Sequence, residues 1–480
     1  MNHGPYTPSL LFLPEHAHSH VPGNDHNTDG DRHSPTPLLH TILHLQPEAS
    51  SGHTAILFPS RYDVHDAAAD DGSSGSRTQT TFIYQSDNDT FLPYVSPAMR
   101  SQYGGFQRVG GMQEVFVYSA TFDRRVTPPE VKAVVISPGR LLNLTFHCVF
   151  GSTTSGAFHV HGDFKFIPEP KWNYTYRSGV VTCPLPHHGV RPKTLSLVAP
   201  GVHEALNVLP IRYPPHPTYN LTRCYPAFHS TFNEVSTLIS NIEISRVLGV
   251  ERFIFYNYDM NDTVSKVLRQ YQQEGIVEVR NWYLPIPHES IHYWGQLAVI
   301  HDCLFSQTGL SRFVIFADVD EFVIPRKVTS IVRLAESLLF DNSFTGKFFG
   351  ALAFRNVFFP AILPETNQIF PQRSAAKAFN IVPLLHLTHA QVHRAYDRSK
   401  VLVIPEAIEL LWIHSVEKFK ENWIPRVVDG DVALLHHYRY VPFPDMKHPW
   451  YDDQLLLRYS SLIVSAVRRR YSRLRQLGML

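Results

Sequence analysis

The sequence predicts an α/β protein in three parts: a disordered segment over residues 1–110, a small β-rich domain over 111–215 and a larger α/β domain over 216–480. Three observations predict this division. The first part is polar and rich in small residues. The second contains short β-rich pieces separated by Pro and Gly, and in the third, strands and helices alternate.

The composition limits the kind of partner that the chain can bind. It has 480 residues, of which 44% are hydrophobic and 18% charged, so it can bury at least one large core. Its 43 basic and 42 acidic residues give a formal net charge of +1. A partner held mainly by its phosphates needs a basic surplus, so we expect no nucleic acid partner.

The first part is expected to be disordered. Residues 65–80 read HDAAADDGSSGSRTQT, without a periodic apolar pattern. Such a segment cannot bury enough apolar surface to offset the entropy that ordering removes.

The second part is expected to be a small β domain. Two of the four cysteines, Cys148 and Cys183, fall within it, so a disulfide bridge between them and a pair of buried thiols are both open. The pieces that predict strands are residues 114–122, 131–137, 141–150 and 193–200.

The third part is expected to form a parallel sheet covered by helices, because three strands each follow a helical pattern. Ligands bind to such sheets beyond the carboxyl ends of the strands. Asp318 and Asp320 lie at that edge, directly after the third strand. The predicted helices span residues 230–249, 263–275 and 293–309, and the predicted strands span 252–257, 276–282 and 312–317.

The acidic pair Asp318 and Asp320 predicts a clamp for a metal ion and a diphosphate. Two carboxylates with one residue between them point to opposite sides of a continuous strand, but a turn lets both approach one ion. A hard divalent cation prefers such oxygens and keeps positions open for water and phosphates. The alternative is a pair of solvated acids at a strand end.

A basic run lies on the predicted C-terminal helix, and we interpret it as a solvated face. The apolar positions of the same helix are expected to pack on the core. The run consists of Arg468, Arg469, Arg470, Arg473 and Arg475.

Five glycosylation sequons favour the secretory lumen. No run of 18 or more apolar residues is visible, and residues 9–14 are too short for a signal peptide. Either the start of the sequence is incomplete or the sequons are not glycosylated. The sequons begin at Asn88, Asn143, Asn173, Asn220 and Asn261.

An ordered series of motifs resembles glycosyltransferase family 92. The longest is HYWGQLAVIHDCLFSQTGLSRFVIFADVDEFVIP, residues 292–325, in which a Gly-Gln-Leu-Ala helix leads into an Asp-x-Asp-Glu-Phe strand. The resemblance covers about residues 113–460. Further matches are VYSATFDRR, EISRVLGVERFIFYNYD, QEGIVEV, the Arg398-Ser399-Lys400 triplet and VVDGDVALLHHYR.

The resemblance implies a GT-A-like, Rossmann-type fold and an inverting, metal-dependent transferase. Members of the family typically move galactose from UDP-galactose to a glycan acceptor with a new β linkage. They are mostly Golgi membrane proteins with one N-terminal anchor, and no anchor is visible in this sequence.

The resemblance also implies a site. Asp318 and Asp320 match the metal motif, and His436 and His437 match a late element that commonly supplies a further ligand, which suits a Mn²⁺ ion. A buried, hydrogen-bonded histidine is the alternative for either imidazole. Lys400, with Arg398 beside it, is positioned to neutralise the donor diphosphate, or else is a surface cation.

Inversion requires a base that takes the proton of the acceptor hydroxyl. The candidates are Asp452 and Asp453, before the last predicted helix. A helix cap is the competing interpretation for an Asp at this point.

Two other functions remain as alternatives. Phosphatases that form an aspartyl-phosphate also carry Asp-x-Asp after an apolar strand, but they usually have Thr or Val where this chain has Phe322, and their motif follows the first strand of the domain. A non-catalytic glycan-binding protein would not need a diphosphate clamp.

Overall fold

The computed structural model describes residues 105–151, 157–169, 173–186, 191–202, 204–214, 216–340, 347–440 and 449–480. All but the end of the segment that we expected to be disordered, 1–110, lies outside this range. Strand β1 (Gln107–Val109) falls inside that segment, so ordered structure begins a few residues before the boundary predicted at about residue 110. The reason is Phe106, which is fully buried with its ring 4.9 Å from those of Tyr118 and Trp282.

The β-rich part forms one eight-stranded sheet whose order is β1-β2-β3-β6-β5-β4-β7-β8. An additional parallel pairing of β2 with β8 joins the far end of the sheet back to its beginning. The remaining strands are β2 (Met112–Asp123), β3 (Glu130–Pro138), β4 (Phe146–Gly151), β5 (Phe158–Phe166), β6 (Tyr176–Pro184), β7 (Thr194–Val198) and β8 (Leu209–Arg212).

Cys148 of β4 and Cys183 of β6 form a disulfide, so the bridge is confirmed and the pair of free thiols is wrong. A second disulfide joins Cys224 to Cys303. The first bridge lies in the apolar core of the β-rich part, whose members include Val117, Val135 and Leu197.

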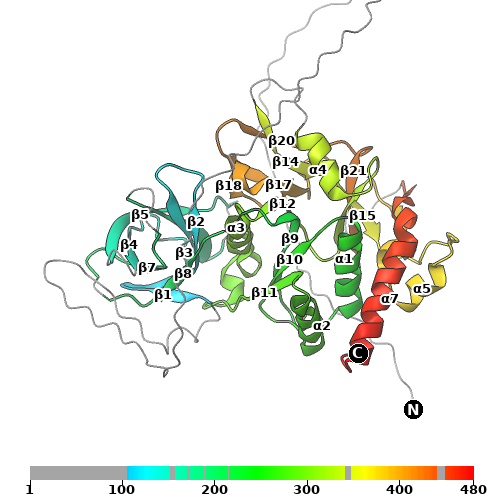
Figure 1. The fold of residues 1–480 in the computed structure, drawn as a ribbon, viewed down its shortest axis with the longest axis horizontal. Helices are drawn as coiled ribbons and strands as arrows, with labels where there is room; N and C mark the ends of the chain where they lie inside the picture. The colour runs from blue at the N-terminus through cyan, green and yellow to red at the C-terminus, as the bar shows by residue number, and fades with distance from the viewer. Residues whose placement is uncertain are drawn as a thin grey trace, which may run out of the picture. The chain divides into compact units, whose positions relative to one another are not determined.

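The α/β part is built on a seven-stranded sheet in the order β11-β10-β9-β12-β17-β14-β20 (Figure 1). The first four strands are parallel, whereas β17 runs antiparallel to both of its neighbours, so the sheet is mixed. The strands are β9 (Tyr219–Phe228), β10 (Arg252–Asn257), β11 (Val277–Asn281), β12 (Ser311–Phe316), β14 (Phe348–Phe354), β17 (Lys400–Val403) and β20 (Trp423–Val428).

The three strands that the sequence predicts are present as β10, β11 and β12, but the central strand β9 was not predicted. Its apolar alternation is interrupted by polar residues and a proline, of which Thr222, Arg223 and Pro226 are examples. A strand surrounded by other elements tolerates such residues when each buried polar group finds a partner.

Helices cover both faces of this sheet. Helix α2 begins where the Asn261 side chain accepts a hydrogen bond from the Thr263 amide (2.8 Å), which is a typical N-cap. The helices are α1 (Val235–Val247), α2 (Asp262–Gln273), α3 (Gln296–Gln307), α4 (Ile331–Leu339), α5 (Arg373–Ala378), α6 (Val382–Leu385) and α7 (Ser460–Gln476), with short 3-10 turns at His288–Ser290, His292–Gly295, Pro405–Ala407 and Leu455–Tyr459.

Helix α3 begins three residues later than the expected start at Tyr293. Tyr293 and Trp294 have positive φ angles of 40° and 52°, and Gly295 follows at 76°. These left-handed residues cannot continue a right-handed helix, so α3 starts at Gln296. All its residues are buried, because it contacts β9 and β12 on one side and β2 and β3 on the other.

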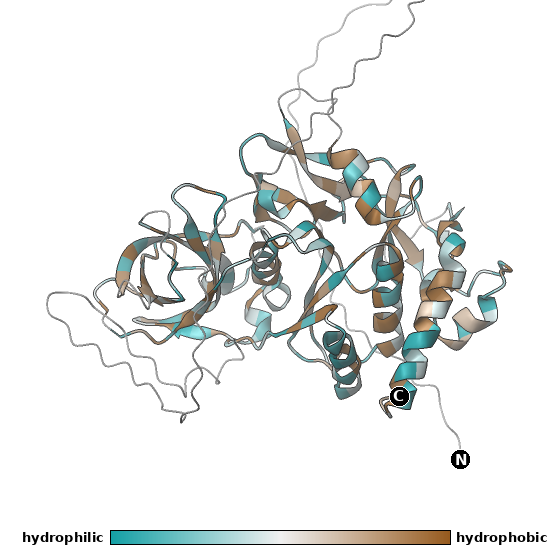
Figure 2. Cartoon of the chain, in the orientation of Figure 1, coloured by the Kyte–Doolittle hydropathy of each residue, from teal (hydrophilic) through white to brown (hydrophobic). Residues whose placement is uncertain are grey.

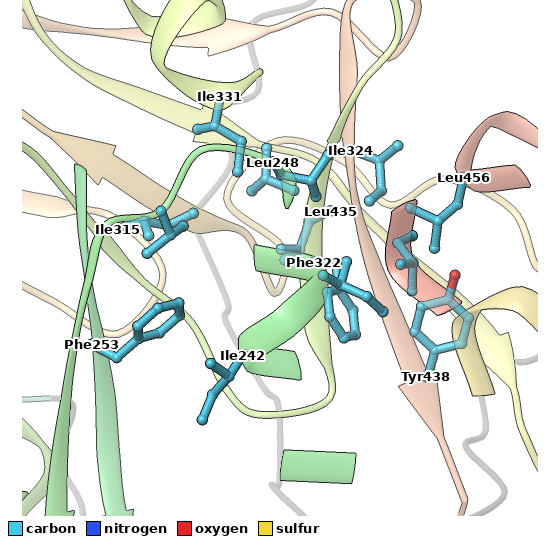
Figure 3. Packing of buried hydrophobic residues seen from close by; sticks show 14 of the residues in the cluster. Ile242, Leu248, Phe253, Ile315, Phe322, Ile324, Ile331, Leu435, Tyr438 and Leu456 are labelled. Carbon is cyan, nitrogen blue, oxygen red and sulfur yellow. The ribbon is translucent and has the colours of Figure 1, made fainter. Parts of the chain in front are cut away.

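The strands of the central sheet are apolar on both faces, as β12 illustrates. Phe313 and Ile315 pack into the core shared with α1, α2 and α7, while Val314 and Phe316 pack into the core shared with α3. Successive side chains of a strand point to opposite faces, so a continuous apolar run serves two cores. Figure 2 shows this hydrophobic colouring in the strands, and Figure 3 shows the first core at close range.

The C-terminal helix α7 departs from the expected solvated basic face. Arg470 is only 6% exposed, and it forms ion pairs with Glu274 (2.6 Å) and Glu243 (3.2 Å). The solvated interpretation is therefore wrong for Arg470. The other members of the run, Arg468, Arg469, Arg473 and Arg475, are exposed.

Three small sheets complete the α/β part. The one that matters for the site has the order β13-β21-β15 and follows directly from β12 through a short turn. The strands are β13 (Glu321–Pro325), β15 (Asn356–Pro360), β21 (Ala433–Arg439), β16 (Thr388–His389), β22 (Tyr451–Asp452), β18 (Ile408–Leu411) and β19 (Val416–Phe419). No helix within the described residues is long and apolar enough to cross a membrane.

Candidate active site

The acidic pair lies on the short turn between β12 and β13, at the carboxyl end of a central strand. The side chains of Asp318 and Asp320 are 31% and 21% exposed, whereas that of Glu321 is 2% exposed. The turn breaks the strand alternation and brings the three carboxylates to one place.

A lysine and a histidine face these carboxylates. Lys400 Nζ lies 3.1 Å from Asp318 Oδ2 and 3.7 Å from Glu321 Oε2. His437 Nε2 lies 3.3 Å from Asp320 Oδ2, and its Nδ1 lies 3.2 Å from Glu321 Oε1. Glu321 therefore links both ends of the group, and we call these five residues the open cluster.

The backbone of the turn is held by buried donors. Arg223, which is 2% exposed, donates to the carbonyl oxygens of Asp318 (2.6 Å) and Glu321 (2.7 Å). The Asn241 amide donates to the Val319 carbonyl oxygen at 2.6 Å. The Tyr438 amide donates to the Asp320 carbonyl oxygen at 2.9 Å. Each of the four carbonyl groups is thus bound, which fixes the path of the turn and leaves the side chains to respond to a ligand.

The two predicted histidines point in opposite directions. Strand β21 pairs with β13, so that His437 lies opposite Glu321 and His436 lies opposite Phe322. Because side chains alternate along a strand, only one imidazole can face the acidic turn. His437 faces it, and His436 stacks on the Phe359 ring at 4.5 Å on the other side.

His436 belongs instead to a second group with Arg326 and Asp453, which we call the closed cluster. Asp453 Oδ2 lies 2.5 Å from Arg326 Nη2 and 3.4 Å from His436 Nε2. Asp453 Oδ1 accepts a hydrogen bond from the Leu455 amide at 3.0 Å. The last contact, at the start of a 3-10 turn, is of the capping kind that competes with the catalytic interpretation.

The structure does not bring the candidate bases to the acidic turn. Asp453 is 5% exposed, and the described contacts of its carboxylate are with Arg326 and His436 of the closed cluster and with the Leu455 amide. Asp452 is exposed on β22, where it accepts a hydrogen bond from the Thr388 hydroxyl (3.2 Å). The catalytic role of either one stays a prediction.

The electrostatics of the two clusters differ. Burial alone would raise the pKa of Asp320, but His437 and Arg439 outweigh it and lower that pKa below its ordinary value. Burial raises the pKa of Glu321 to about 7, against the opposing charge of Lys400. In the closed cluster burial would raise the pKa of Asp453, but His436, the Leu455 amide and Arg326 hold it below its ordinary value.

Arg398 borders the open cluster through an aromatic ring. Its guanidinium lies 5.8 Å from the centre of the Phe358 ring, which is itself 5.1 Å from the ring of His437. The backbone of Arg398 has a positive φ of 54°, in a region that few residues other than glycine adopt.

The side chains of the open cluster are of the chemical types that bind a divalent cation. Carboxylate oxygens and one imidazole are ligands that Mn²⁺ accepts. In the part of the chain that the structure describes, no group of three or more His, Cys, Asp or Glu side chains has the geometry to hold a metal ion. Asp318 pairs with Lys400 and Asp320 with His437, so binding requires these side chains to rotate while the turn stays in place.

Several residues of the site were not predicted from the sequence: Arg223, Asn241 and Asn356, with Glu321 noted only for its position. Asn356 is fully buried, with Nδ2 3.3 Å from His437 Nδ1. One signal was available for Arg223. A charged residue between Thr222 and Cys224, inside a buried strand, needs acceptors within the core.

Comparisons with known proteins place these features in a family context. The sequence profile of the family described as Glycosyltransferase family 92 matches residues 219–463, which is just over half of the 480 residues. The Caenorhabditis elegans protein "Beta-1,4-galactosyltransferase galt-1" is 23% identical over 260 residues, covering 52% of this chain and 56% of the relative. "Glycosyltransferase family 92 protein F13G3.3" of the same organism is 22% identical over 211 residues, covering 42% of this chain and 39% of the relative. The chain thus spans about half or less of the length of these curated relatives.

Among solved structures, one similar chain is glucosyl-3-phosphoglycerate synthase from Mycobacterium tuberculosis in complex with Mn²⁺, UDP-glucose and phosphoglyceric acid. Its TM-score is 0.24 and its sequence identity 13%, over 52% of this chain and 79% of that chain.

Proposed function

Because the chain belongs to glycosyltransferase family 92, we propose that it transfers a sugar from a nucleotide diphosphate donor to a glycan acceptor. The observation that carries the proposal is the partly exposed pair Asp318 and Asp320, on a turn whose carbonyl groups are all held by buried donors. The crevice beyond the carboxyl ends of parallel strands is where this class of sheet binds nucleotides.

We propose that Asp318, Asp320 and His437 hold a divalent cation, with Mn²⁺ the first choice. Such an ion neutralises the charge of a diphosphate when it is bound. Asp318 and Asp320 supply hard oxygen ligands, and His437 supplies the nitrogen that favours a Mn-like ion. In this proposal His436 takes no part, because it faces the closed cluster.

Lys400 is the residue that we propose to receive the leaving diphosphate. It is 4% exposed and lies between Asp318 and Glu321, so its ammonium group is held at the acidic turn. When the donor is bound, its charge stabilises the negative charge that develops on the departing oxygen. The position of Arg398 near Phe358 makes it a second cation for the same diphosphate in this proposal.

UDP-galactose as donor, a β linkage and inversion are the finer parts of the proposal. They are supported by the printed name of one relative, a β-1,4-galactosyltransferase at 23% identity. Inversion requires a base, for which Asp452 and Asp453 are the proposed candidates. Asp453 would have to leave its pairing with Arg326 to act, which makes the exposed Asp452 the easier of the two to test.

We also propose that the protein works in the Golgi, within the lumen or at its membrane. Disulfides persist in oxidising compartments, and the structure has two. Asn143 and Asn173, each the start of a sequon, are exposed. The sequon at Asn88 lies outside the described residues.

The test is a panel of UDP-sugars incubated with the full chain, with UDP release measured in Mn²⁺ and in EDTA. We expect release only with Mn²⁺, fastest from UDP-galactose, and stimulated by a glycan acceptor. Glycan binding without UDP release from any donor would favour the non-catalytic alternative and overturn the proposal.

A further inference from the structure

The small sheet β13-β21-β15 carries a row of side chains that begins at the open cluster and leads away from it. Glu321 of β13 lies opposite His437 of β21, and His437 lies opposite Phe358 of β15. Residues directly opposite one another on neighbouring strands point to the same face of a sheet. The face that carries the open cluster therefore continues across β15 to the chain that follows β16.

His393 is the next member of this row. Its amide donates to the Asn356 carbonyl oxygen of β15 at 2.9 Å, so the chain runs alongside that strand. Its ring meets the Phe358 ring edge to face at 4.9 Å, and the ring of His437 lies 5.1 Å from the same phenylalanine. Since neighbouring strands are about 4.8 Å apart, the imidazoles of His393 and His437 are separated by two strand spacings, or roughly 10 Å.

A carboxylate holds the imidazole of His393 by one of its nitrogens. His393 Nδ1 lies 2.9 Å from Asp397 Oδ2. Because a carboxylate only accepts hydrogen bonds, Nδ1 carries the proton in this contact, and a neutral ring has its lone pair on Nε2. Among the residues that the structure describes, none forms a hydrogen bond with Nε2. The side chain of His393 is 9% exposed, as is that of His437, so Nε2 is left to meet a ligand.

The loop that carries Asp397 is strained and ends at the open cluster. Tyr396 and Arg398, on either side of Asp397, have positive φ angles of 67° and 54°. The Tyr396 amide donates to the Ser399 hydroxyl at 2.9 Å, and Lys400 of the open cluster follows directly. Residues in this region of φ cost free energy and cluster at active sites. A surface ion pair without function is the competing interpretation for Asp397, which is 55% exposed, but it does not account for this strain.

The place of His393 in the row suits a base that acts on the acceptor. In a direct displacement the acceptor oxygen approaches the anomeric carbon from the side opposite the diphosphate, to about 3–3.5 Å. The base lies about 3 Å beyond that oxygen. It therefore stands away from the groups that hold the ion, as His393 does, separated from His437 by one aromatic ring.

We propose that His393 is the general base of the transfer and that Asp397 positions it. Nε2 takes the proton of the acceptor hydroxyl while the acceptor oxygen forms its bond to the anomeric carbon. The bond from that carbon to the diphosphate breaks, and the nucleoside diphosphate leaves with its electron pair. The Asp397 carboxylate stabilises the imidazolium that results. The inference rests on the proposed function and adds a third candidate base to Asp452 and Asp453, which the structure does not bring to the acidic turn.

The test measures transfer by the full chain from UDP-galactose, with Mn²⁺, to methyl glycosides of galactose, glucose, mannose, N-acetylglucosamine and fucose. His393→Gln should lower kcat about 10²- to 10⁴-fold, which is the usual contribution of a general base, and leave the KM for UDP-galactose unchanged. Asp397→Asn should lower kcat by a smaller factor, again at unchanged KM, because it removes the group that orients the ring. The control is His161→Gln, an exposed histidine of β5, which should keep the wild-type kcat.

Added imidazole separates a base from a residue that only supports the fold. In His393→Ala, free imidazole can enter the space of the missing ring and accept the proton, so kcat should rise with the imidazole concentration. The melting temperature of each variant is measured beside it. A residue that only packs on Phe358 predicts no such recovery, because imidazole in solution does not restore a covalently anchored contact.

The outcomes distinguish the base from the proposed function. A wild-type kcat in His393→Gln overturns the base while the transferase proposal stands. A lowered kcat that comes with a raised KM for UDP-galactose, or that imidazole does not restore in His393→Ala, assigns His393 to the fold and overturns it as well. If water is the only acceptor that the wild-type chain uses, UDP release replaces transfer in the same comparisons. If the wild-type chain releases no UDP from any donor, the proposed function fails and the base fails with it.

Discussion

Two neighbouring histidines of β21 lead to two clusters of opposite character. His437 faces the open cluster, where the side chains of Asp318 and Asp320 are 31% and 21% exposed. His436 faces the closed cluster, where Asp453 is 5% exposed and paired with Arg326. The same strand therefore supplies one imidazole to a group that solvent can reach and one to a group that it cannot.

The difference in charge and exposure between the two clusters indicates which of them can bind a cation. The open cluster has three carboxylates against one lysine and one histidine, so negative charge is in excess. The closed cluster has one carboxylate against an arginine and a histidine, so its charge is already compensated. A buried pair that satisfies itself is a structural feature, whereas an accessible excess of negative charge favours a cation as ligand.

The largest expected effect is the loss of UDP-sugar turnover when a carboxylate of the open cluster is removed. Asp320→Ala should reduce UDP-sugar turnover by about 10²-fold or more, because it removes a proposed ligand of the ion that neutralises the diphosphate. EDTA should reduce wild-type turnover to a similar degree, and added Mn²⁺ should restore it. The control is Asp163→Asn, which alters an exposed ion pair of β5 with Lys165. Wild-type turnover in Asp320→Ala would end the proposed role of this residue.

Asp453→Ala should have its main effect on folding. It leaves Arg326 and His436 without their carboxylate in a buried place, and breaking such a pair costs about 3–5 kcal/mol of the free energy of unfolding. Urea unfolding followed by fluorescence measures this loss. The matched variant Asp452→Ala, one residue away and exposed, should stay within about 0.5 kcal/mol of wild type. Equal stabilities of the two variants would contradict the closed cluster as a structural pair.

A smaller effect, on Mn²⁺ affinity, is expected when the hydrogen bonds that hold the acidic turn are removed. Arg223→Met keeps the bulk of the side chain and removes the donors to the carbonyl groups of Asp318 and Glu321. Loss of an outer contact of this kind typically weakens metal binding about 10- to 100-fold. Mn²⁺ titration by calorimetry measures it, with Arg312→Met, whose side chain is 38% exposed, as control. Unchanged Mn²⁺ affinity in a folded Arg223→Met chain would show that the turn does not need this residue.

The sequence predicted the parts of the fold in which the pattern is local. Strand β12 is a continuous apolar run and α2 has a regular helical period with a cap at Asn261, so both were found. Strand β9 was missed because Arg223 looks unfavourable in a strand until its acceptors, about a hundred residues further on, are known. The turn at Tyr293 and Trp294 was missed because no residue there requires a positive φ.

For the site, as for the fold, the sequence predicted the local features and missed those that depend on distant residues. The position of Asp318 and Asp320 after a strand is a local feature, and it indicated the edge of the sheet. Alternation along β21 implies that His436 and His437 face opposite ways, but only the pairing of His437 with Glu321 shows which of them meets the turn. The partner of Asp453 is Arg326, which lies 127 residues away in the chain, so no local pattern could identify it.

The smallest expected effect is a dependence of stability on acid pH that belongs to the closed cluster. The pKa of Asp453 in the folded chain lies below its ordinary value of 3.8, because His436, the Leu455 amide and Arg326 oppose the effect of burial. In acid the folded state therefore binds fewer protons than the unfolded state. The contribution of Asp453 to the free energy of unfolding is complete above about pH 5, and it is lost as the pH falls below 3.8 towards the pKa of the folded chain. Between pH 5 and pH 3 the gap in unfolding free energy between wild type and Asp453→Asn should shrink by about 1 kcal/mol. Urea unfolding at a series of pH values measures the gap, and the dependence should be weaker in an Arg326→Met background, since that variant removes one cause of the low pKa. A gap that stays constant down to pH 3 would mean that the carboxylate is not held by this pairing, and the contrast between the two clusters would then rest on exposure alone.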